Sequence, residues 1–439
     1  MQIIFIVFIA AYFVLAIIKK PNDKKGDDNF ILASRKATLF PLVATLVTSQ
    51  YGWISGVFET YFIYGPKAWF ILSLPYLIIN FIWIKLVSYL RNTASPILDT
   101  PALLAKHYGE KTGAITAVFY VWLLIPFMYV HMGAQLLEQY LQMPWAFAII
   151  LFLLLSSLAY FKGGFINILH QDKILFGCIY ISLCMLFFSL ISKPEIIQNH
   201  KNIVSIGIDQ GLNWVLLSLI VFIDPAVHQR IWAAKSTNVI KSSFRWALFF
   251  WIIFDILIIG LVWQLNTKFS ADLKLFSSIF ALLNDWQGLI LAILAFSVII
   301  STANTYFFTA SSFFNQYFMP KKWKIKYSFL SGLIIIVIVF IILYFGFQDK
   351  SVLSILFQFY PIAISALLLP VLTAILPVKK LSPSFLRIQL FSSAIICLLC
   401  QLDCIKITIF ADAQALLFGL SASAIVQLLY YYVKSKKKR

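Results

Sequence analysis

The sequence predicts an all-α integral membrane protein with about 13 transmembrane helices. Apolar residues make up 61% of its 439 residues and charged residues only 12%, and the mean hydropathy is +0.90. Apolar runs of about 20 residues, the length that crosses a bilayer as a helix, recur from one end of the chain to the other. A soluble globular protein is therefore excluded.

The expected spans follow the apolar runs in order. The first, at residues 2–18, lacks the basic residues that open a secretory signal, and its lysine pair comes after the apolar run, so we expect a retained helix. The others are expected at residues 38–65, 68–90, 112–137, 143–161, 163–191, 208–230, 240–264, 286–316, 327–346, 351–377, 383–402 and 409–433.

The net charge of +18 follows the predicted topology and does not indicate a nucleic-acid partner. Most Lys and Arg residues lie in segments after odd-numbered spans, including the tail KSKKKR. By the positive-inside rule, the amino terminus is outside and the carboxyl terminus is cytoplasmic. Residues 19–37 are polar enough for a cytoplasmic linker but not for a core. We expect a cell membrane protein in contact with lipid, in the bacterial inner membrane; the oligomeric state is left open.

A few strongly polar residues lie deep within the spans, where they are costly unless they serve a function. At about 1.5 Å per helical residue, Gln50, Asp172 and Ser301 all fall near the middle of a core roughly 30 Å thick. Residues 300–312 read ISTANTYFFTASS, the most polar run inside a long apolar segment. These positions are the best indication of function that the residues give.

At about 100° per residue, one face of this segment collects most of its hydroxyls, and Asn304 and Ser311 point elsewhere. The shared face holds Val298, Ser301, Thr302, Thr305, Thr309 and Ser312. Such a stripe fits helix packing, with hydroxyls bonded to carbonyls one turn back. It also fits oxygen ligands for a small hard cation, and the stripe alone does not decide.

Two spans contain interruptions, TSQYGWISG in the second and IDP in the seventh. Interrupted helices in corresponding positions of two halves indicate a transporter's binding site at the midplane. Residues 38–191 and 208–377 each hold five spans, and an odd number forces opposite orientations. We therefore expect two inverted five-helix repeats, preceded by residues 1–37 with one helix and a linker, and followed by residues 383–439 with two accessory helices and a basic tail.

Five segments in order resemble the sodium:solute symporter family, which includes sodium/proline, sodium/pantothenate and sodium/glucose transporters. They are NFILASRKATLF at 29–40, LDTPALLAKHYG at 98–109, GGFINILHQD at 163–172, DPAVHQRIWAAKS at 224–236 and STANTYFFTASS at 301–312. The resemblance implies a secondary active transporter, not an enzyme, that couples sodium entry to uptake of a small organic solute by alternating access.

The resemblance also implies a set of sodium ligands. Ser301 and Thr302 would give side-chain oxygens, Val298 a backbone carbonyl, and Asp172 a carboxylate on the cation path. Carbonyls at the break in the second span would complete the shell, with Val47 and Gln50 favoured and Leu46 and Ser49 as the competing register. The family's Thr and Gln near the Asp are Gln171 and Leu175 here, which leaves sodium or a proton as the coupling ion.

The aromatic residues Tyr51, Trp53 and Trp214 are the expected wall of the substrate site, with packing an equal reading for Trp214. Glu59, Asp255 and His131 are weaker candidates that structural pairing explains as well. A solute sensor on a transporter scaffold is a further alternative. A membrane-embedded enzyme needs a metal set or a nucleophile with a base, and the five histidines and four glutamates show no such spacing.

Overall fold

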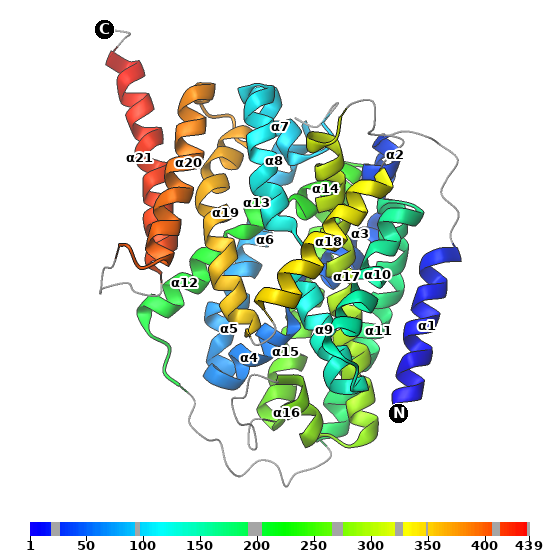
Figure 1. The fold of residues 1–439 in the computed structure, drawn as a ribbon. Coiled ribbons are helices and arrows are strands. Elements are labelled where there is room, and N and C mark those ends of the chain that lie inside the picture. The colour runs from blue at the N-terminus through cyan, green and yellow to red at the C-terminus, as the bar shows by residue number, and fades with distance from the viewer. Residues whose placement is uncertain are drawn as a thin grey trace. The chain divides into compact units, whose positions relative to one another are not determined.

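The structure is a computed structural model, and its described residues are helical nearly throughout (Figure 1). The described ranges are 1–18, 27–92, 97–191, 204–265, 275–320, 328–347, 350–405 and 413–436. Within them, the only β-type pairing is an isolated bridge between Ala37 and Ala234. The all-helical class is therefore as predicted.

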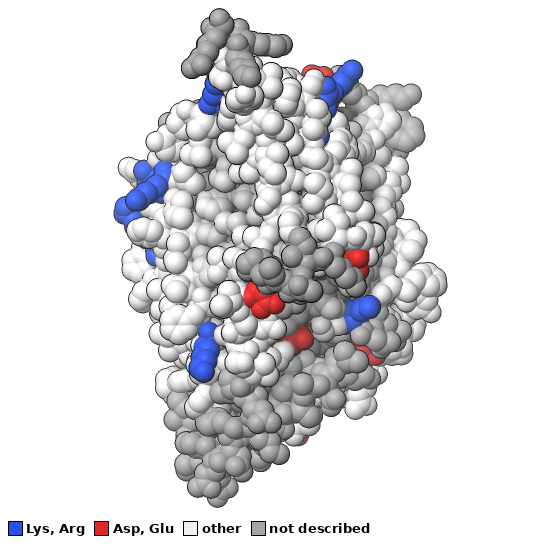
Figure 2. All heavy atoms as spheres, turned by 90° about the vertical axis from the view of Figure 1, so that its left-hand side faces the viewer, with Lys and Arg blue, Asp and Glu red and all other residues white. Residues whose placement is uncertain are grey.

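In the described part of the chain, eleven helices are long and apolar enough to cross a membrane. Two shorter apolar helices, at residues 2–17 and 39–50, fall in the first two predicted spans. Figure 2 shows one face of the molecule, on which uncharged side chains cover most of the described surface and charged ones occur in small scattered groups. The count of 13 spans and the orientation of the termini stay predictions.

The chain divides by its contacts into two units, each built from segments that are distant in sequence. The first unit comprises Met1–Trp69, Ile125–Ser205 and Ala233–Ile355, and the second comprises Phe70–Leu124, Ile206–Trp232 and Leu356–Arg439. Both units draw helices from the predicted repeats at 38–191 and 208–377. Contact clustering therefore does not test those repeats, which stay a prediction.

The first unit is organised around the long helix α17 (Asp285–Phe318), which packs against α3, α9, α10, α11 and α18. Its other elements are α1 (Gln2–Ile18), α2 (Asp27–Leu32), η1 (Ala33–Arg35), α3 (Leu39–Gln50), α4 (Ile54–Tyr64), η2 (Gly65–Lys67), α9 (Phe127–Leu141), α10 (Trp145–Lys162), α11 (Phe165–Ile191), α15 (Thr237–Leu265), α16 (Leu275–Leu282) and α18 (Ser328–Gly346). Since neighbours surround α17, its hydroxyls face protein instead of lipid.

A reciprocal cap sets the start of α17. The Asn284 side chain accepts a hydrogen bond from the Gln287 backbone N–H at 2.9 Å, and the Gln287 side chain accepts from the Asn284 N–H at 3.2 Å. This capping box satisfies two N–H groups that have no partner inside the helix. The box fixes where the helix begins and therefore which depth each hydroxyl reaches.

The second predicted span is broken, as the sequence indicates. Helix α3 ends at Gln50, residues 51–53 form a turn, and α4 begins at Ile54. A break of this kind removes hydrogen-bond partners from the last carbonyls of α3, so those oxygens can bind other groups.

The second unit contains the other predicted interruption. Its elements are α6 (Ser73–Asn92), α7 (Thr100–Tyr108), α8 (Glu110–Leu124), α12 (Ile208–Ser218), α13 (Ile220–Ile223), α14 (Pro225–Ala233), α20 (Pro383–Gln401) and α21 (Gln414–Lys436). The backbone leaves the helical region at Asp224, with ψ of 110°. The Asp224 carboxylate then accepts from the Ala226 N–H at 2.8 Å, so this acid caps α14. A boundary between the units falls within α5 (Ala68–Ile71), within α19 (Val352–Ile375) and before the last residue of α14.

Two segments differ from the sequence expectation. The linker expected at 19–37 is helical over α2 and η1, while residues 19–26 lie outside the described part, as do residues 437–439 of the basic tail. The span expected at 112–137 consists of two helices, α8 and α9, separated at Pro126. Proline has no N–H to donate and crowds the preceding turn, which ends α8.

Candidate cation site

Three helices of the first unit bring hydroxyl and carboxylate oxygens together. Ser301 Oγ on α17 lies 2.7 Å from Thr48 Oγ1 on α3 and 2.7 Å from Asp172 Oδ1 on α11. All three side chains are buried. A hydroxyl carries one hydrogen, so Ser301 donates to the carboxylate and Thr48 donates to Ser301. Asp172 and Ser301 were expected at the site, whereas Thr48 was noted only as part of a polar run.

Thr302 lies beside this cluster and faces the end of α3. Its hydroxyl is 3.3 Å from the Ser49 carbonyl and 3.2 Å from the Val298 carbonyl one turn back on α17. Thr302 thus has the back-bonded geometry of a packing residue, and it also has the carbonyl of a broken helix within reach. Thr302 therefore fits both interpretations of the stripe, helix packing and cation binding.

Gly52 allows the break to approach α17 closely. A Cβ atom at this position would lie 2.1 Å from Thr302 Oγ1 and 2.3 Å from Thr302 Cβ, far inside ordinary contact. A side chain of any size would therefore separate the break from Thr302 or force one of them to move. The glycine in TSQYGWISG is explained by this contact.

Thr302 contacts one carbonyl at the end of α3. The carbonyl that Thr302 reaches belongs to Ser49, which the sequence left as the competing register together with Leu46. Val47 is buried on α3, and Gln50, the last residue of α3, is half-buried. Ligation by Val47 and Gln50 stays a prediction.

The expected aromatic wall divides between the two units. Tyr51 and Trp53 lie buried in the break of the first unit, and Trp214 lies buried on α12 of the second unit, where its ring packs edge-on against Phe357. Tyr51 donates its hydroxyl proton to Asp255 Oδ1 on α15 at 2.5 Å, and its ring stacks on Phe254 with centroids 4.0 Å apart. Tyr51 therefore joins the break to α15.

The acid Asp255 has the structural pairing that the sequence allowed. Besides the Tyr51 hydroxyl, its Oδ2 accepts a hydrogen bond from the Trp69 indole N–H at 3.1 Å. His131, the other weak candidate on α9, lies 3.1 Å through Nε2 from the Lys350 carbonyl. Both groups hold neighbouring elements of the first unit together.

A second polar cluster also lies between α17 and α11, beside the Ser301 cluster, and the sequence did not predict it. Asn304, Tyr12 and Gln171 form a triangle, with Asn304 2.6 Å from the Tyr12 hydroxyl and 2.8 Å from the Gln171 side chain. The Tyr12 hydroxyl is 3.0 Å from Gln171. The available signal was the placement of Asn304 off the hydroxyl stripe, together with Gln171 in place of the family's Thr.

The later hydroxyls of α17 behave as packing groups. Thr309 donates to the Thr305 carbonyl at 2.8 Å, one turn back. Among the residues described, the hydroxyls of Ser311 and Ser312 have no hydrogen-bond partner. The separation of Ser301 and Thr302 from the rest of the stripe therefore has a geometric basis.

The chemistry of the Ser301 cluster suits a small hard cation. Hydroxyls, a carboxylate and backbone carbonyls are the oxygen ligands that such ions prefer. A carboxylate as deeply buried as Asp172 is stable only with hydrogen bonds and charge compensation, so it is the group that gains most from a bound cation.

No family model and no curated protein matches the chain by sequence. Solved structures do match it. A Na⁺-coupled sialic acid symporter in a substrate-bound outward-open state matches with a TM-score of 0.75 at 12% identity, over 98% of each chain. A nucleobase-cation-symport-1 family transporter in a closed conformation matches with a TM-score of 0.58 at 11% identity, over 91% of this chain and 94% of the other.

A manganese transporter from Eremococcus coleocola matches with a TM-score of 0.52 at 13% identity, over 95% of this chain and 97% of the other. These identities are too low to carry residue roles from one chain to another, and what they share is the course of the helices. The chain is thus a multi-pass membrane protein with the all-helical fold of inverted-repeat transporters.

Proposed function

We propose that this protein is a secondary active transporter that couples sodium entry to the uptake of a small organic solute by alternating access. The observation that carries the proposal is the buried contact of Ser301 with both Asp172 and Thr48, beside the break between α3 and α4. The likeness in fold to a Na⁺-coupled sialic acid symporter supports it.

In the proposed site, Asp172, Ser301 and Thr48 supply side-chain oxygens and Thr302 a further hydroxyl. The Ser49 and Val298 carbonyls, both close to Thr302 Oγ1, are the nearest backbone donors. Since the site joins α3, α11 and α17, a cation bound there would hold the broken helix against the other two. Release of the cation would free the break to move, which is how ion binding would be coupled to a change of conformation.

The sodium gradient is strong enough for this task. One positive charge that crosses about 100 mV releases roughly 2.3 kcal/mol, and a tenfold concentration gradient adds about 1.4 kcal/mol. Together these terms can drive an accumulation of several hundredfold. We assign the solute site to the surroundings of the break, with Tyr51 and Trp53 as its aromatic residues. A role for Trp214, which belongs to the second unit, stays a prediction.

Membership of the sodium:solute symporter family is proposed on the five resembling segments. The bacterial inner membrane is the location we propose for the protein. Proton coupling is the second candidate, because Asp172 is a buried titratable group at the centre of the cluster. A proton would need only the carboxylate, whereas sodium would also need the surrounding oxygens. Loss of the Thr48 hydroxyl therefore separates the two coupling ions.

The test is uptake of labelled amino acids, sugars, vitamins and carboxylates into proteoliposomes that contain the purified protein. We expect at least one solute to accumulate under an inward sodium gradient and not under an equal potassium gradient. Uptake driven equally well by a proton gradient without sodium would overturn sodium coupling. Binding of a solute without any gradient-driven accumulation would instead favour a sensor.

A further inference from the structure

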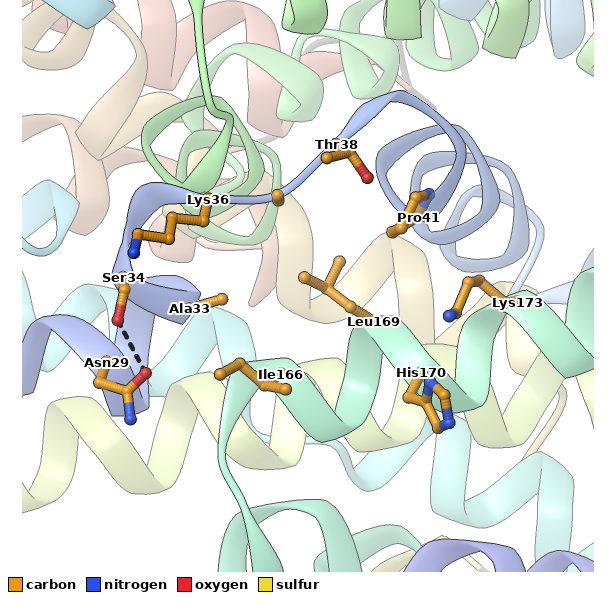
Figure 3. A pocket seen from close by; sticks show the side chains of 11 residues that line it. Asn29, Ala33, Ser34, Lys36, Thr38, Pro41, Ile166, Leu169, His170 and Lys173 are labelled. Atoms are coloured by element: carbon orange, nitrogen blue, oxygen red, sulfur yellow. Dashed lines mark hydrogen bonds between the residues drawn. The ribbon is translucent and has the colours of Figure 1, made fainter. Parts of the chain in front are cut away.

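A cavity of about 280 Å³ lies in the first unit, outside the proposed cation site. Its walls come from the α2 to η1 segment, the start of α3, and one face of α11 (Figure 3). The residues that matter for its chemistry are Lys36, Thr38, His170 and Lys173. The end of the cavity at Lys36 and Thr38 belongs to the part of the fold that the sequence predicts on the cytoplasmic side. Lys173 follows Asp172 and so starts deeper in α11, from where its long side chain would extend toward the headgroup region.

The cavity is positively charged. None of its eleven lining residues is an acid, and the described part of the chain offers neither Lys36 nor Lys173 a carboxylate partner. Figure 3 shows the Lys173 amino group directed toward the cavity near Leu169 and His170, while Lys36 lies at the other end, near Ser34. Two uncompensated lysines on one small cavity attract an anion.

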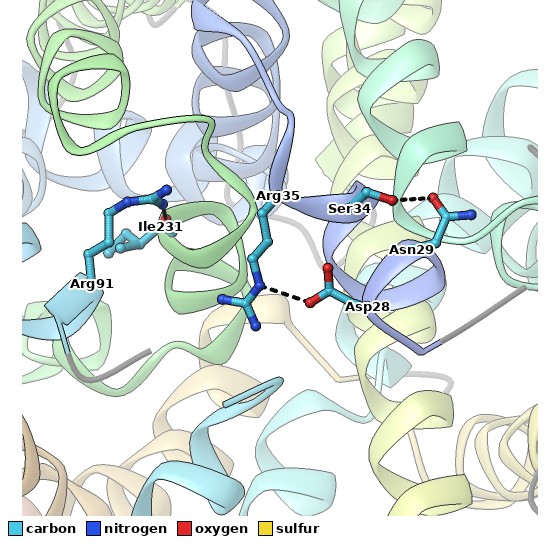
Figure 4. Close-up of polar contacts among 6 residues, drawn as sticks. All are labelled: Asp28, Asn29, Ser34, Arg35, Arg91 and Ile231. Atoms are coloured by element: carbon cyan, nitrogen blue, oxygen red, sulfur yellow. Dashed lines mark hydrogen bonds and ion pairs between the residues drawn. The ribbon is translucent and has the colours of Figure 1, made fainter. Parts of the chain in front are cut away.

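The two described acids that adjoin lining residues in the chain, Asp28 and Asp172, are both already bonded to other groups. Asp28 forms an ion pair with Arg35 at 2.8 Å, and the Ser34 hydroxyl donates to the Asn29 side chain at 2.8 Å (Figure 4). Asp172 precedes Lys173 but lies about 100° away around α11, bonded to Ser301. The positive potential of the cavity is thus not cancelled by its immediate surroundings.

The cavity is built by the fold and is not a gap between loose side chains. Gly164, with φ of +67°, lets the chain turn into α11 under α2, because a Cβ there would lie 2.5 Å from the Phe30 carbonyl oxygen. Thr38, the residue before α3, makes no side-chain cap, so its hydroxyl is not used by the helix end. These features leave a polar hollow with a helix amino terminus at its edge, which favours negative charge.

Exposed apolar residues beside the cavity favour a lipid over a soluble anion as its ligand. Phe40 and Ile174, which adjoin the lining residues in the chain, have 53% and 40% of their surface exposed. Phe40 packs edge-on against Phe176, with ring centroids 6.0 Å apart, so α3 and α11 share an apolar outer surface beside the cavity. A bilayer lipid would place its headgroup among the lysines and its acyl chains on this surface.

We propose that this cavity binds the headgroup of an anionic phospholipid, with Lys36 and Lys173 as its cationic ligands. Basic pockets between membrane helices on the cytoplasmic side are suited to such headgroups, because that leaflet carries the anionic lipids. The bound lipid would hold η1 and the start of α3 against α11, at the base of the broken helix. The proposal does not depend on which ion drives transport.

The experiment measures lipid binding to the purified full chain in detergent by native mass spectrometry, with phosphatidylglycerol and phosphatidylcholine as the two probes. We expect phosphatidylglycerol to bind at least tenfold more tightly. Lys173→Gln should weaken its binding about fivefold and Lys36→Gln with Lys173→Gln about twenty-fivefold, whereas Lys173→Arg should bind like the wild type. The matched control is Lys241→Gln, which removes a half-buried lysine near the start of α15 that does not line the cavity.

Three results would overturn the proposal. They are equal binding of the two lipids, unchanged phosphatidylglycerol binding by the double variant, and an equal loss in the Lys241→Gln control. Displacement of phosphatidylglycerol by millimolar inorganic phosphate would show that a soluble anion is the ligand and would also overturn it. A photoactivatable phosphatidylglycerol gives an independent measurement on the wild-type protein, and it should label peptides that contain residues 36 and 173.

Discussion

Substitution of Gly52 by alanine is a small change with a large expected effect on cation binding. The added Cβ would lie 2.1 Å from Thr302 Oγ1, while ordinary van der Waals contact begins at 3.4 Å. The break and α17 must therefore separate by roughly 1.3 Å, or Thr302 must rotate away from the Ser49 carbonyl. Either movement separates oxygens that we assign to the same cation.

Overpacking of a tight contact typically costs about 1–3 kcal/mol. If this cost falls on the cation-bound state, the apparent sodium affinity decreases by roughly 5- to 150-fold. The assay is the rise in melting temperature of the purified protein with increasing sodium, with potassium as the reference. A ligand at 100 times its dissociation constant stabilises a protein by about 2.7 kcal/mol, so a loss of this size is measurable.

Gly177→Ala on α11 is the matched control, because a Cβ there meets nothing within 4 Å. This variant should keep the sodium response and gain a little stability from the better helix former. A sodium response of Gly52→Ala equal to that of the wild type, or an equal loss in both glycine variants, would contradict the assignment of these oxygens to one cation.

Three further predictions follow from the same contacts. Asp172→Asn keeps the shape of the side chain but removes its charge, so the sodium-dependent rise in melting temperature should be lost; retention of the full rise would show that the carboxylate is not a ligand. Tyr51→Phe leaves Asp255 without one hydrogen bond and should lower the free energy of unfolding by about 1–3 kcal/mol, which chemical denaturation measures; an unchanged value would mean that Tyr51 does not hold the break to α15. Burial, with Lys380 and Lys106 nearby, lowers the pKa of His107 from 6.5 to about 4. Between these two pH values the unfolded chain binds a proton at His107 and the folded protein does not. The free energy of unfolding therefore falls as the pH decreases through that window. His107→Gln should reduce this loss in a series of melting temperatures from pH 7 to 4, and a parallel pair of curves would contradict the pKa shift.

The sequence predicted the features that follow from the lengths of the apolar runs and from the interruptions within those runs. The break at Tyr51–Gly52–Trp53 and the one at Asp224 appear where polar residues, Gly and Pro interrupt the apolar pattern. Helical periodicity was also sufficient to place Asn304 apart from Ser301 and Thr302, and the structure places Asn304 against Tyr12 and Gln171. These features depend on local helix geometry, which can be inferred from the order of neighbouring residues in one sequence.

The remaining features depend on contacts between distant segments. Thr48 joins the cluster because α3 packs on α17 in one particular register, and a one-residue difference decides whether Ser49 or Gln50 presents its carbonyl. Tyr12 reaches Gln171 across 159 residues of chain. The helices α2 and η1 lie in a polar segment whose pattern indicates a linker, yet α2 packs on α11 and η1 packs on α2. No periodicity contains this information.

The central claim is that Ser301 and Thr302 bind the coupling cation, and direct binding of radioactive sodium ions to purified protein tests it most closely. Ser301→Ala with Thr302→Ala should weaken sodium binding by at least about tenfold, since it removes two of the proposed ligand oxygens. Thr309→Ala, which removes a back-bonded hydroxyl two turns further along α17, should bind sodium like the wild type. Unchanged sodium binding by a folded Ser301→Ala, Thr302→Ala double variant would contradict the account.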